Sequence, residues 1–96
     1  MNIWVEEIIE VLKNLGESAT LNEIYSLIEK REKLPLKNYV DWKSVVRKNI
    51  YKYSSECDIY SGVMDIFYSV DGKGKGIWGL RKTYPSILFS KVNHGK

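Results

Sequence analysis

Apolar residues recur every three or four positions in three segments of the chain. The segments cover residues 3–15, 21–32 and 42–53, and polar or charged residues fill the positions between the apolar ones. This spacing places the apolar side chains on one face of a helix, where they can pack together. The pattern therefore predicts three amphipathic helices in the first half of the chain.

The residues beside these segments support the predicted helix boundaries. Gly16 follows the first segment, where a left-handed residue ends many helices. Thr20 and Glu23 form a capping box in front of the second segment, and Asp41 is a suitable N-cap for the third. A brief extended segment fits between the first two helices, and residues 33–40, which contain a proline, are predicted to form a loop.

The second half of the chain has the composition of a β-hairpin. Residues 65–70 and 77–81 are rich in β-branched and aromatic residues, which favour strands. Three glycines in residues 71–76 supply the positive φ angles of a turn. Trp78 and Leu80 alternate along the second strand, so both are expected to point into the core.

The length of 96 residues allows one domain, because a second core would need a longer chain. The element order predicts an α+β fold, a winged helix-turn-helix with three helices and a C-terminal hairpin wing, over residues 1–82. Residues 83–96 are interpreted as a C-terminal extension, either partly ordered or an interaction segment. The predicted core consists of Ile8, Leu12, Ile24, Ile28, Val46, Ile50, Trp78 and Leu80.

Charge is distributed unevenly along the chain. Residues 1–32 hold seven acidic residues against three basic ones, and residues 33–96 hold twelve basic residues against five acidic ones. The positions of segment 42–53 that do not belong to its apolar stripe include four basic residues and no acidic one. A surface helix ordinarily mixes charges and gains stability from pairs of opposite sign. The bias therefore favours an anionic partner, although clustering on a solvated surface is the alternative.

Composition argues against several classes of function. Cys57 is the only cysteine and His94 the only histidine, so a disulfide framework, a His-dependent catalytic triad and a multi-His or Cys metal site are not expected. Asp65, Asp71 and Lys73 superficially match a metal-dependent nuclease, but a hairpin tip would not hold them in a fixed geometry. We expect no enzymatic activity, no cofactor and no metal.

The location of the protein is also predicted from the sequence. The first residues lack the basic start and apolar stretch of a secretory signal, and no apolar run is long enough to span a bilayer. We therefore expect no membrane association and a cytoplasmic location, on the nucleoid if the anionic partner is DNA.

Several sequence runs resemble a known family. The runs are Trp42-Lys43-Ser44-Val45-Val46-Arg47, Tyr53-Ser54-Ser55, Asp65-Ile66-Phe67-Tyr68-Ser69-Val70 and Gly74-Lys75-Gly76-Ile77-Trp78-Gly79-Leu80-Arg81. They resemble the winged-helix DNA-binding module found beside restriction endonucleases, typically fused to HNH or other nuclease domains. The resemblance covers about residues 3–82 and implies binding of double-stranded DNA. A nuclease domain or another protein is the further partner that it implies. It does not imply cleavage, because the four runs belong to the DNA-binding module and not to a nuclease domain.

The candidate DNA-binding residues lie on the third predicted helix and in the hairpin. Arg47 and Lys43 are the best candidates for contacts to base edges, because arginine forks onto guanine and the first half of a recognition helix lies closest to the bases. The alternatives for Arg47 are a phosphate contact, a solvated charge or a structural bridge to Asp41 or Asp65. The full set of candidates is Lys43, Ser44, Arg47, Lys48, Tyr51, Lys52, Lys73, Lys75 and Arg81.

Three aromatic residues flank the third predicted helix. Tyr39, Trp42 and Tyr51 are candidates for contact with a thymine methyl or a methylated base. Some restriction-associated winged helices read N6-methyladenine in duplex DNA, so the resemblance makes a modified base one candidate target. Core packing is the alternative, and it is favoured for Trp42, which lies on the apolar stripe.

A protein-interaction role is the second hypothesis. In this interpretation, the acidic face of the first two helices or the apolar residues of segment 87–92 would bind a partner protein. Winged helices serve roles other than DNA binding, and a fold does not determine a function. The salt dependence of duplex binding separates the two hypotheses, because neutralising phosphates makes the affinity fall steeply with salt.

Overall fold

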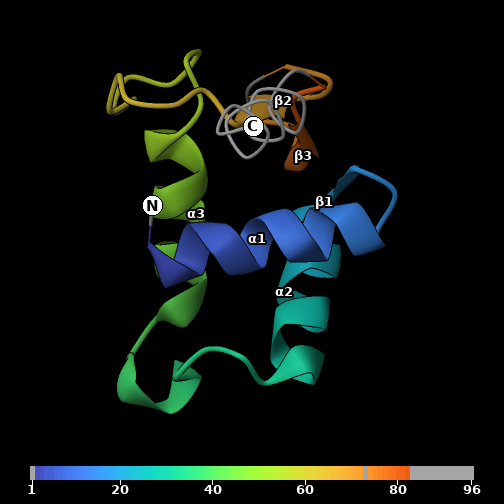
Figure 1. The fold of residues 1–96 in the computed structure, drawn as a ribbon, viewed down its shortest axis with the longest axis vertical. Coiled ribbons are helices and arrows are strands. Elements are labelled where there is room, and N and C mark those ends of the chain that lie inside the picture. The colour runs from blue at the N-terminus through green and yellow to red at the C-terminus, as the bar shows by residue number, and fades with distance from the viewer. Residues whose placement is uncertain (1, 73, 83–96) are drawn as a thin grey trace, which may run out of the picture.

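The computed structural model describes residues 2–72 and 74–82. Over these residues the chain is an α+β protein with three helices and a small antiparallel sheet (Figure 1). The elements in chain order are α1 (Ile3–Asn14), β1 (Ser18–Thr20), α2 (Leu21–Arg31), the 3-10 helix η1 (Leu36–Asn38), α3 (Trp42–Lys52), β2 (Phe67–Ser69) and β3 (Ile77–Leu80). The three predicted helices and the hairpin are thus confirmed, and the arrangement is compatible with a winged helix.

The predicted caps begin and end the helices as the sequence indicates. Thr20 and Glu23 form the complete capping box, in which each residue bonds the backbone amide of the other. The Asp41 carboxylate accepts from the Ser44 amide at 3.2 Å and caps α3. Gly16 has φ +86° directly after the Leu15 C-cap of α1. These local signals therefore fix the helix boundaries to within a residue of the predicted ones.

The sheet has the strand order β1-β3-β2, with both pairs antiparallel. The brief extended segment expected between α1 and α2 is β1, and it pairs with the hairpin by placing Ala19 opposite Trp78. The hairpin strand β2 covers 67–69, which is shorter than the predicted 65–70. It begins late because the Ile66 and Phe67 amides both donate to the Tyr53 carbonyl at the end of α3.

One core joins the three helices and the sheet. All eight residues predicted for the core are buried. Burial removes their apolar surface from water and supplies most of the driving force for folding. The other buried apolar residues are Trp4, Val5, Ile9, Val11, Ala19, Tyr25, Leu34, Ile66 and Phe67.

Figure 1 shows how this core positions the candidate site. Helix α1 crosses the view, α2 lies below its C-terminal half, and α3 crosses near its N-terminal end. The sheet lies above α1, on the side opposite the connection between α2 and α3. One side of α3 packs inward through Val46, Asn49 and Ile50, which leaves the opposite side of the helix facing outward.

The connection between α2 and α3 is mostly without regular structure. The loop predicted over residues 33–40 contains one short 3-10 turn, η1, whose carbonyls at Pro35 and Leu36 accept from the Asn38 and Tyr39 amides. The predicted extension 83–96 lies outside the described residues. None of the described helices has the length and apolar character needed to cross a membrane.

Candidate nucleic-acid interface

The outward side of α3 carries the predicted cluster of positive charge. We call this side the basic face, and Lys43, Lys48 and Lys52 on it are exposed, whereas Arg47 and Tyr51 are half-buried. Among the described residues, no carboxylate forms an ion pair with a basic residue of this face. Helix α3 therefore presents positive charge to solvent that is not ion-paired within the described residues. The face consists of Lys43, Ser44, Arg47, Lys48, Tyr51 and Lys52.

Tyr25 of α2 organises the first half of this face. Its ring is buried against Trp42 in an edge-to-face contact with centroids 5.7 Å apart. The Lys43 ammonium lies 5.3 Å from the centre of the Tyr25 ring, which is within cation–π range. The Tyr25 hydroxyl accepts a hydrogen bond from Arg47 Nη1 at 2.9 Å. These four side chains form the Tyr25 cluster, which ties two basic residues to one buried ring.

The partner of Arg47 is a neutral hydroxyl. The hydrogen bond to Tyr25 raises the pKa of Arg47 above its ordinary value, since it stabilises the charged form. The structural bridge to Asp41 or Asp65 left open by the sequence is not formed: Asp41 caps α3, and Asp65 pairs with Arg81. A hydroxyl orients the guanidinium but does not cancel its charge, so Arg47 remains a cation on the basic face.

Arg81 is placed differently from the other candidates. Its Nε lies 2.9 Å from Asp65 Oδ1, an ion pair without hydrogen-bond alignment at that nitrogen, and its Nη2 donates to Ser55 Oγ at 3.3 Å. Glu56 lies 3.9 Å away, and the Tyr68 ring lies against the guanidinium. These contacts form the Arg81 network (Ser55, Glu56, Asp65 and Arg81), which joins the loop after α3 to β3. Arg81 is therefore a structural residue in this state.

Asp65 is the acidic centre of that network. Partial burial alone would raise the pKa of Asp65, but hydrogen bonds from the Ser55 hydroxyl and amide, together with the charge of Arg81, lower it below its usual range. In the sequence, Asp65 superficially matches a nuclease-like set with Asp71 and Lys73. Its side chain is instead occupied by the Arg81 network.

The remaining polar candidates are distributed between α3 and the hairpin. Ser44 uses its hydroxyl locally, since it donates to the Asp41 carbonyl at 3.0 Å. Lys75 is exposed beyond Gly74 in the turn of the hairpin. Lys73 lies outside the described residues. The described part of the candidate interface is thus the basic face together with Lys75.

Each of the three candidate aromatics contacts another ring of the fold. Tyr39 is exposed at one edge, and its ring makes an edge-to-face contact with Trp4 at 5.1 Å. Trp42 is half-buried, with its ring in edge-to-face contact with Tyr25, so the favoured expectation of core packing holds only in part. The third aromatic candidate, Tyr51, packs its ring against Trp78 of β3 with centroids 5.6 Å apart.

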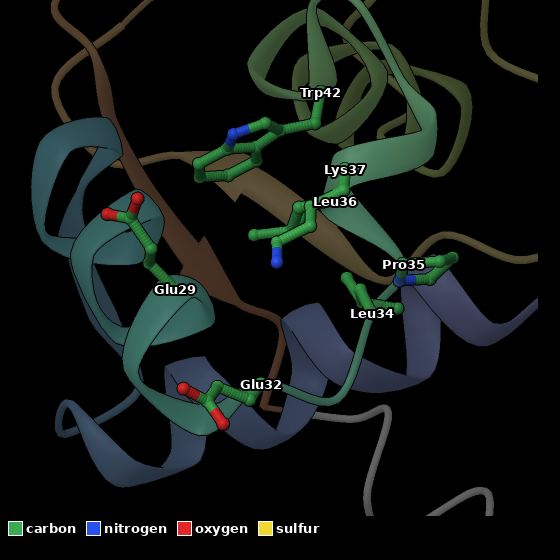
Figure 2. Close-up of a pocket in the computed structure, with 7 residues that line it drawn as sticks. All are labelled: Glu29, Glu32, Leu34, Pro35, Leu36, Lys37 and Trp42. Atoms are coloured by element: carbon green, nitrogen blue, oxygen red, sulfur yellow. The ribbon is translucent and has the colours of Figure 1, made fainter.

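Two hollows lie beside these residues. The α2–α3 groove, of about 580 Å³, has Glu29 of α2 and Glu32, the C-cap of α2, on one side and Leu36, Lys37 and Trp42 on the other (Figure 2). The hairpin pocket, of about 310 Å³, lies between α3, the following loop and the hairpin. Its lining residues are Tyr51, Cys57, Asp58, Ile59, Gly74 and Trp78. Over the ranges 2–72 and 74–82, no group of three or more acidic, histidine or cysteine side chains is arranged to hold a metal ion.

Comparisons with protein-family models, with curated proteins and with solved structures find no match for this chain. The function therefore has to be argued from its own residues. The resemblance to restriction-associated winged helices remains a hypothesis that rests on the four sequence runs.

Sequence reasoning missed Tyr25 as a residue of the site. The three- and four-residue spacing of segment 21–32 assigns Tyr25 to the apolar stripe together with Ile24 and Ile28. Tyr25 is indeed buried, but its hydroxyl reaches Arg47, 22 positions later in the chain. The signal in the sequence was a tyrosine on a core stripe. A buried tyrosine hydroxyl needs a hydrogen-bond partner, but the stripe does not say which residue supplies it.

Proposed function

We propose that this chain is a winged-helix module that binds double-stranded DNA, with α3 as the recognition helix and the β2–β3 hairpin as the wing. The observation that carries the proposal is the basic face of α3, on which Lys43, Arg47 and Lys48 lie without a paired carboxylate among the described residues. Helices of this kind enter the major groove of B-DNA.

Each part of the surface has a chemical role in this proposal. Arg47 is the base-reading residue, because a guanidinium held at one end by Tyr25 can present its remaining donors to guanine O6 and N7. Lys48, Lys52 and Lys75 are phosphate contacts, which set orientation and affinity but not sequence preference. Tyr25 is a positioning residue, since it acts through Arg47 and is itself buried.

The finer part of the proposal comes from the resemblance alone. Modules beside restriction endonucleases read defined or modified sites, so the preferred target is a specific duplex or one that carries N6-methyladenine. A nuclease domain or partner protein would then act on the bound DNA. A binding screen with plain and adenine-methylated duplexes of the same sequences tests this part, and equal affinities for all of them would contradict it.

The salt dependence of duplex affinity tests DNA binding itself. We expect the logarithm of the association constant to fall linearly with the logarithm of salt between about 50 and 200 mM, with a slope near −0.9 for each phosphate neutralised. Lys75→Ala should flatten the slope by about one unit on every duplex. Lys30→Ala is the matched control, because Lys30 is exposed on α2, away from the basic face. A flat response of the unmodified protein would contradict DNA binding.

A protein-binding role is the second candidate, and the α2–α3 groove favours it. Its apolar floor of Leu34, Pro35 and Leu36 is bordered by Glu29 and Glu32 (Figure 2). Such a groove suits a peptide with an apolar side chain beside a basic one. If the chain binds peptides and not duplex DNA, Glu29→Lys should weaken the binding of such a peptide. If the chain binds duplex DNA, Glu29→Lys should leave the duplex affinity unchanged.

A further inference from the structure

The hairpin pocket lies where the proposed recognition helix meets the proposed wing. Tyr51 lines it from α3 and Trp78 from β3, and Gly74 closes it from the hairpin turn. Exposed lysines follow two of these residues directly in the chain, Lys52 after Tyr51 and Lys75 after Gly74. Among the described residues, neither lysine is part of the lining, and each is the chain neighbour of a residue that is.

The lining has an aromatic part, an aliphatic part and one charged group. The rings of Tyr51 and Trp78 pack at a tilt of 49°. Ile59 adds a side chain that is 48% exposed, although it is large and apolar. Asp58 supplies a carboxylate, which accepts hydrogen bonds and donates none when ionised. At Gly74, φ is +87°, and apart from its two chain neighbours no atom of the described residues lies within 4 Å of where a Cβ would stand, so no side chain crowds this part of the lining.

These features match an unpaired nucleobase better than a paired one. Within a duplex, neighbouring pairs cover the faces of each base, and only the base edges are presented in the grooves. An unpaired base exposes a planar face that stacks on aromatic side chains, and its Watson–Crick edge is free for hydrogen bonds. A carboxylate is the natural acceptor for an exocyclic amino group. Lys52 and Lys75, as exposed chain neighbours of Tyr51 and Gly74, are the candidates for contacts to the flanking phosphates.

We propose that the hairpin pocket holds one unpaired base with an exocyclic amino group, such as adenine, while the basic face of α3 holds the adjoining duplex. The base stacks on Tyr51, and its amino group donates to Asp58. The proposal rests on the proposed function, since the basic face must bring the duplex to the pocket. It adds recognition of a local defect or an extruded base to the reading of a duplex.

Binding to a set of matched duplexes tests the proposal. The set contains one sequence fully paired, the same sequence with one extra adenine, with one extra thymine and with one extra abasic nucleotide. The abasic form bends the duplex as an extra nucleotide does but offers no base. Fluorescence anisotropy on labelled duplexes should show the extra-adenine form binding about 5- to 150-fold more tightly than the abasic form, as expected for one stacked base. The extra-thymine form should lie between them, because thymine lacks the amino group.

Substitutions in the lining test whether the preference for the extra-adenine duplex comes from the hairpin pocket. Tyr51→Ala should remove the preference for extra adenine over the abasic form, and Tyr51→Phe should retain it. Asp58→Asn should reduce the advantage of adenine over thymine. Ile59→Ser should weaken the preference, and Val63→Ser is its matched control, because Val63 is an exposed apolar residue of the same loop that does not line the pocket. If Tyr51→Ala lowers the melting temperature so far that it does not fold, Ile59→Ser against Val63→Ser decides.

The outcomes separate this proposal from the proposed function. Salt-dependent binding of the fully paired duplex with equal affinity for the adenine and abasic forms would overturn the pocket assignment and leave DNA binding standing. A gain on a fully paired, adenine-methylated duplex without a gain on extra adenine would also overturn it, since the pocket would then take a methyl group. Absence of binding to every duplex would overturn both proposals.

Discussion

Arg47 and Arg81 are two arginines that the sequence assigns to the same DNA-binding surface, yet their surroundings differ. Arg81 lies 2.9 Å from the Asp65 carboxylate and reaches Ser55 as well. Arg47 has a neutral partner, the Tyr25 hydroxyl, at the same distance of 2.9 Å. A carboxylate offsets the charge of a guanidinium, whereas a hydroxyl only orients it. A positive charge in the sequence is therefore available to a polyanion only where the fold leaves it unpaired.

The surroundings of Arg81 also give a structural reason for several of the sequence runs that carry the resemblance. Arg81 ends the run Gly76-Ile77-Trp78-Gly79-Leu80-Arg81, and its network joins this run to Ser55 and Asp65, which lie in two other runs of the resemblance. Position 79 of the same run requires glycine, because the Tyr68 ring on the paired strand fills the space that a Cβ would need. The nearest ring carbon would lie 2.6 Å from that Cβ. Three of the four runs are thus explained by the structure around the hairpin.

The largest effect is expected at Trp78, which connects α3, the helix of Arg47, with β3, the strand before Arg81. Trp78 is 5% exposed, contacts Tyr51 of α3 and lies three positions before Arg81. Trp78→Ala should lower the free energy of unfolding by about 3–5 kcal/mol, measured by urea denaturation. That is a large share of the roughly 5–15 kcal/mol typical of a domain. Trp42→Ala is the matched control, because Trp42 is only half-buried and should cost less. Equal costs would contradict the assigned core.

Arg81→Ala should act on stability. It leaves the Asp65 carboxylate, which is half-buried, without its counter-charge, and we expect a loss of about 1–3 kcal/mol in the free energy of unfolding. Duplex affinity, measured at a temperature where the variant is folded, should change little. In a double-mutant cycle with Asp65→Ala, the two losses should not add, because the residues share one interaction. Additive losses, or a large loss of affinity in the folded variant, would place Arg81 in the DNA contact instead.

The predictability of the fold and of the site differed for a physical reason. Helix caps and the hairpin turn depend on residues close in sequence, such as Thr20 with Glu23, so the sequence predicted them well. The eight core residues followed from periodicity and are all buried. The pairing of Arg81 with Asp65 and of Arg47 with Tyr25 depends on side chains 16 and 22 positions apart in the chain, which no periodicity reports. The clustering of basic residues thus identified α3 as the basic helix, but it did not show which of the two arginines has a carboxylate partner.

Arg47→Ala should act on binding. If Arg47 reads a guanine, its loss should cost about 1–3 kcal/mol on the preferred duplex and less on unrelated duplexes. Lys48→Ala is the matched control on the same face and should weaken all duplexes alike. Melting of both variants should be measured beside binding. If Arg47→Ala, Lys43→Ala and Lys48→Ala all leave affinity and preference unchanged in folded protein, α3 is not the recognition helix.

Acidic pH should weaken the Arg81 network and leave the Arg47 charge in place. The folded-state pKa of Asp65 lies below its unfolded value, so its contribution to stability is present above the unfolded pKa of about 3.8 and is lost as the pH falls through the folded pKa. Asp65→Asn should therefore remove part of the loss of stability seen in urea denaturation below about pH 4. Asp71→Asn, which removes one exposed carboxylate in the hairpin turn, is the matched control for the change of charge.

Tyr25→Phe gives the smallest and most selective effect, because it removes the hydroxyl and keeps the ring. The ring contacts to Trp42 and Lys43 should survive, while the hydrogen bond to Arg47 is lost. We expect the free energy of unfolding to fall by about 0.5–1.5 kcal/mol, the usual net value of one hydrogen bond. Affinity for the preferred duplex should fall by less than in Arg47→Ala, with an unchanged salt slope, because the charge and the phosphate contacts remain. Tyr60→Phe, in the loop after α3, is the control. A changed salt slope would mean that Tyr25 holds the helix and not the guanidinium alone.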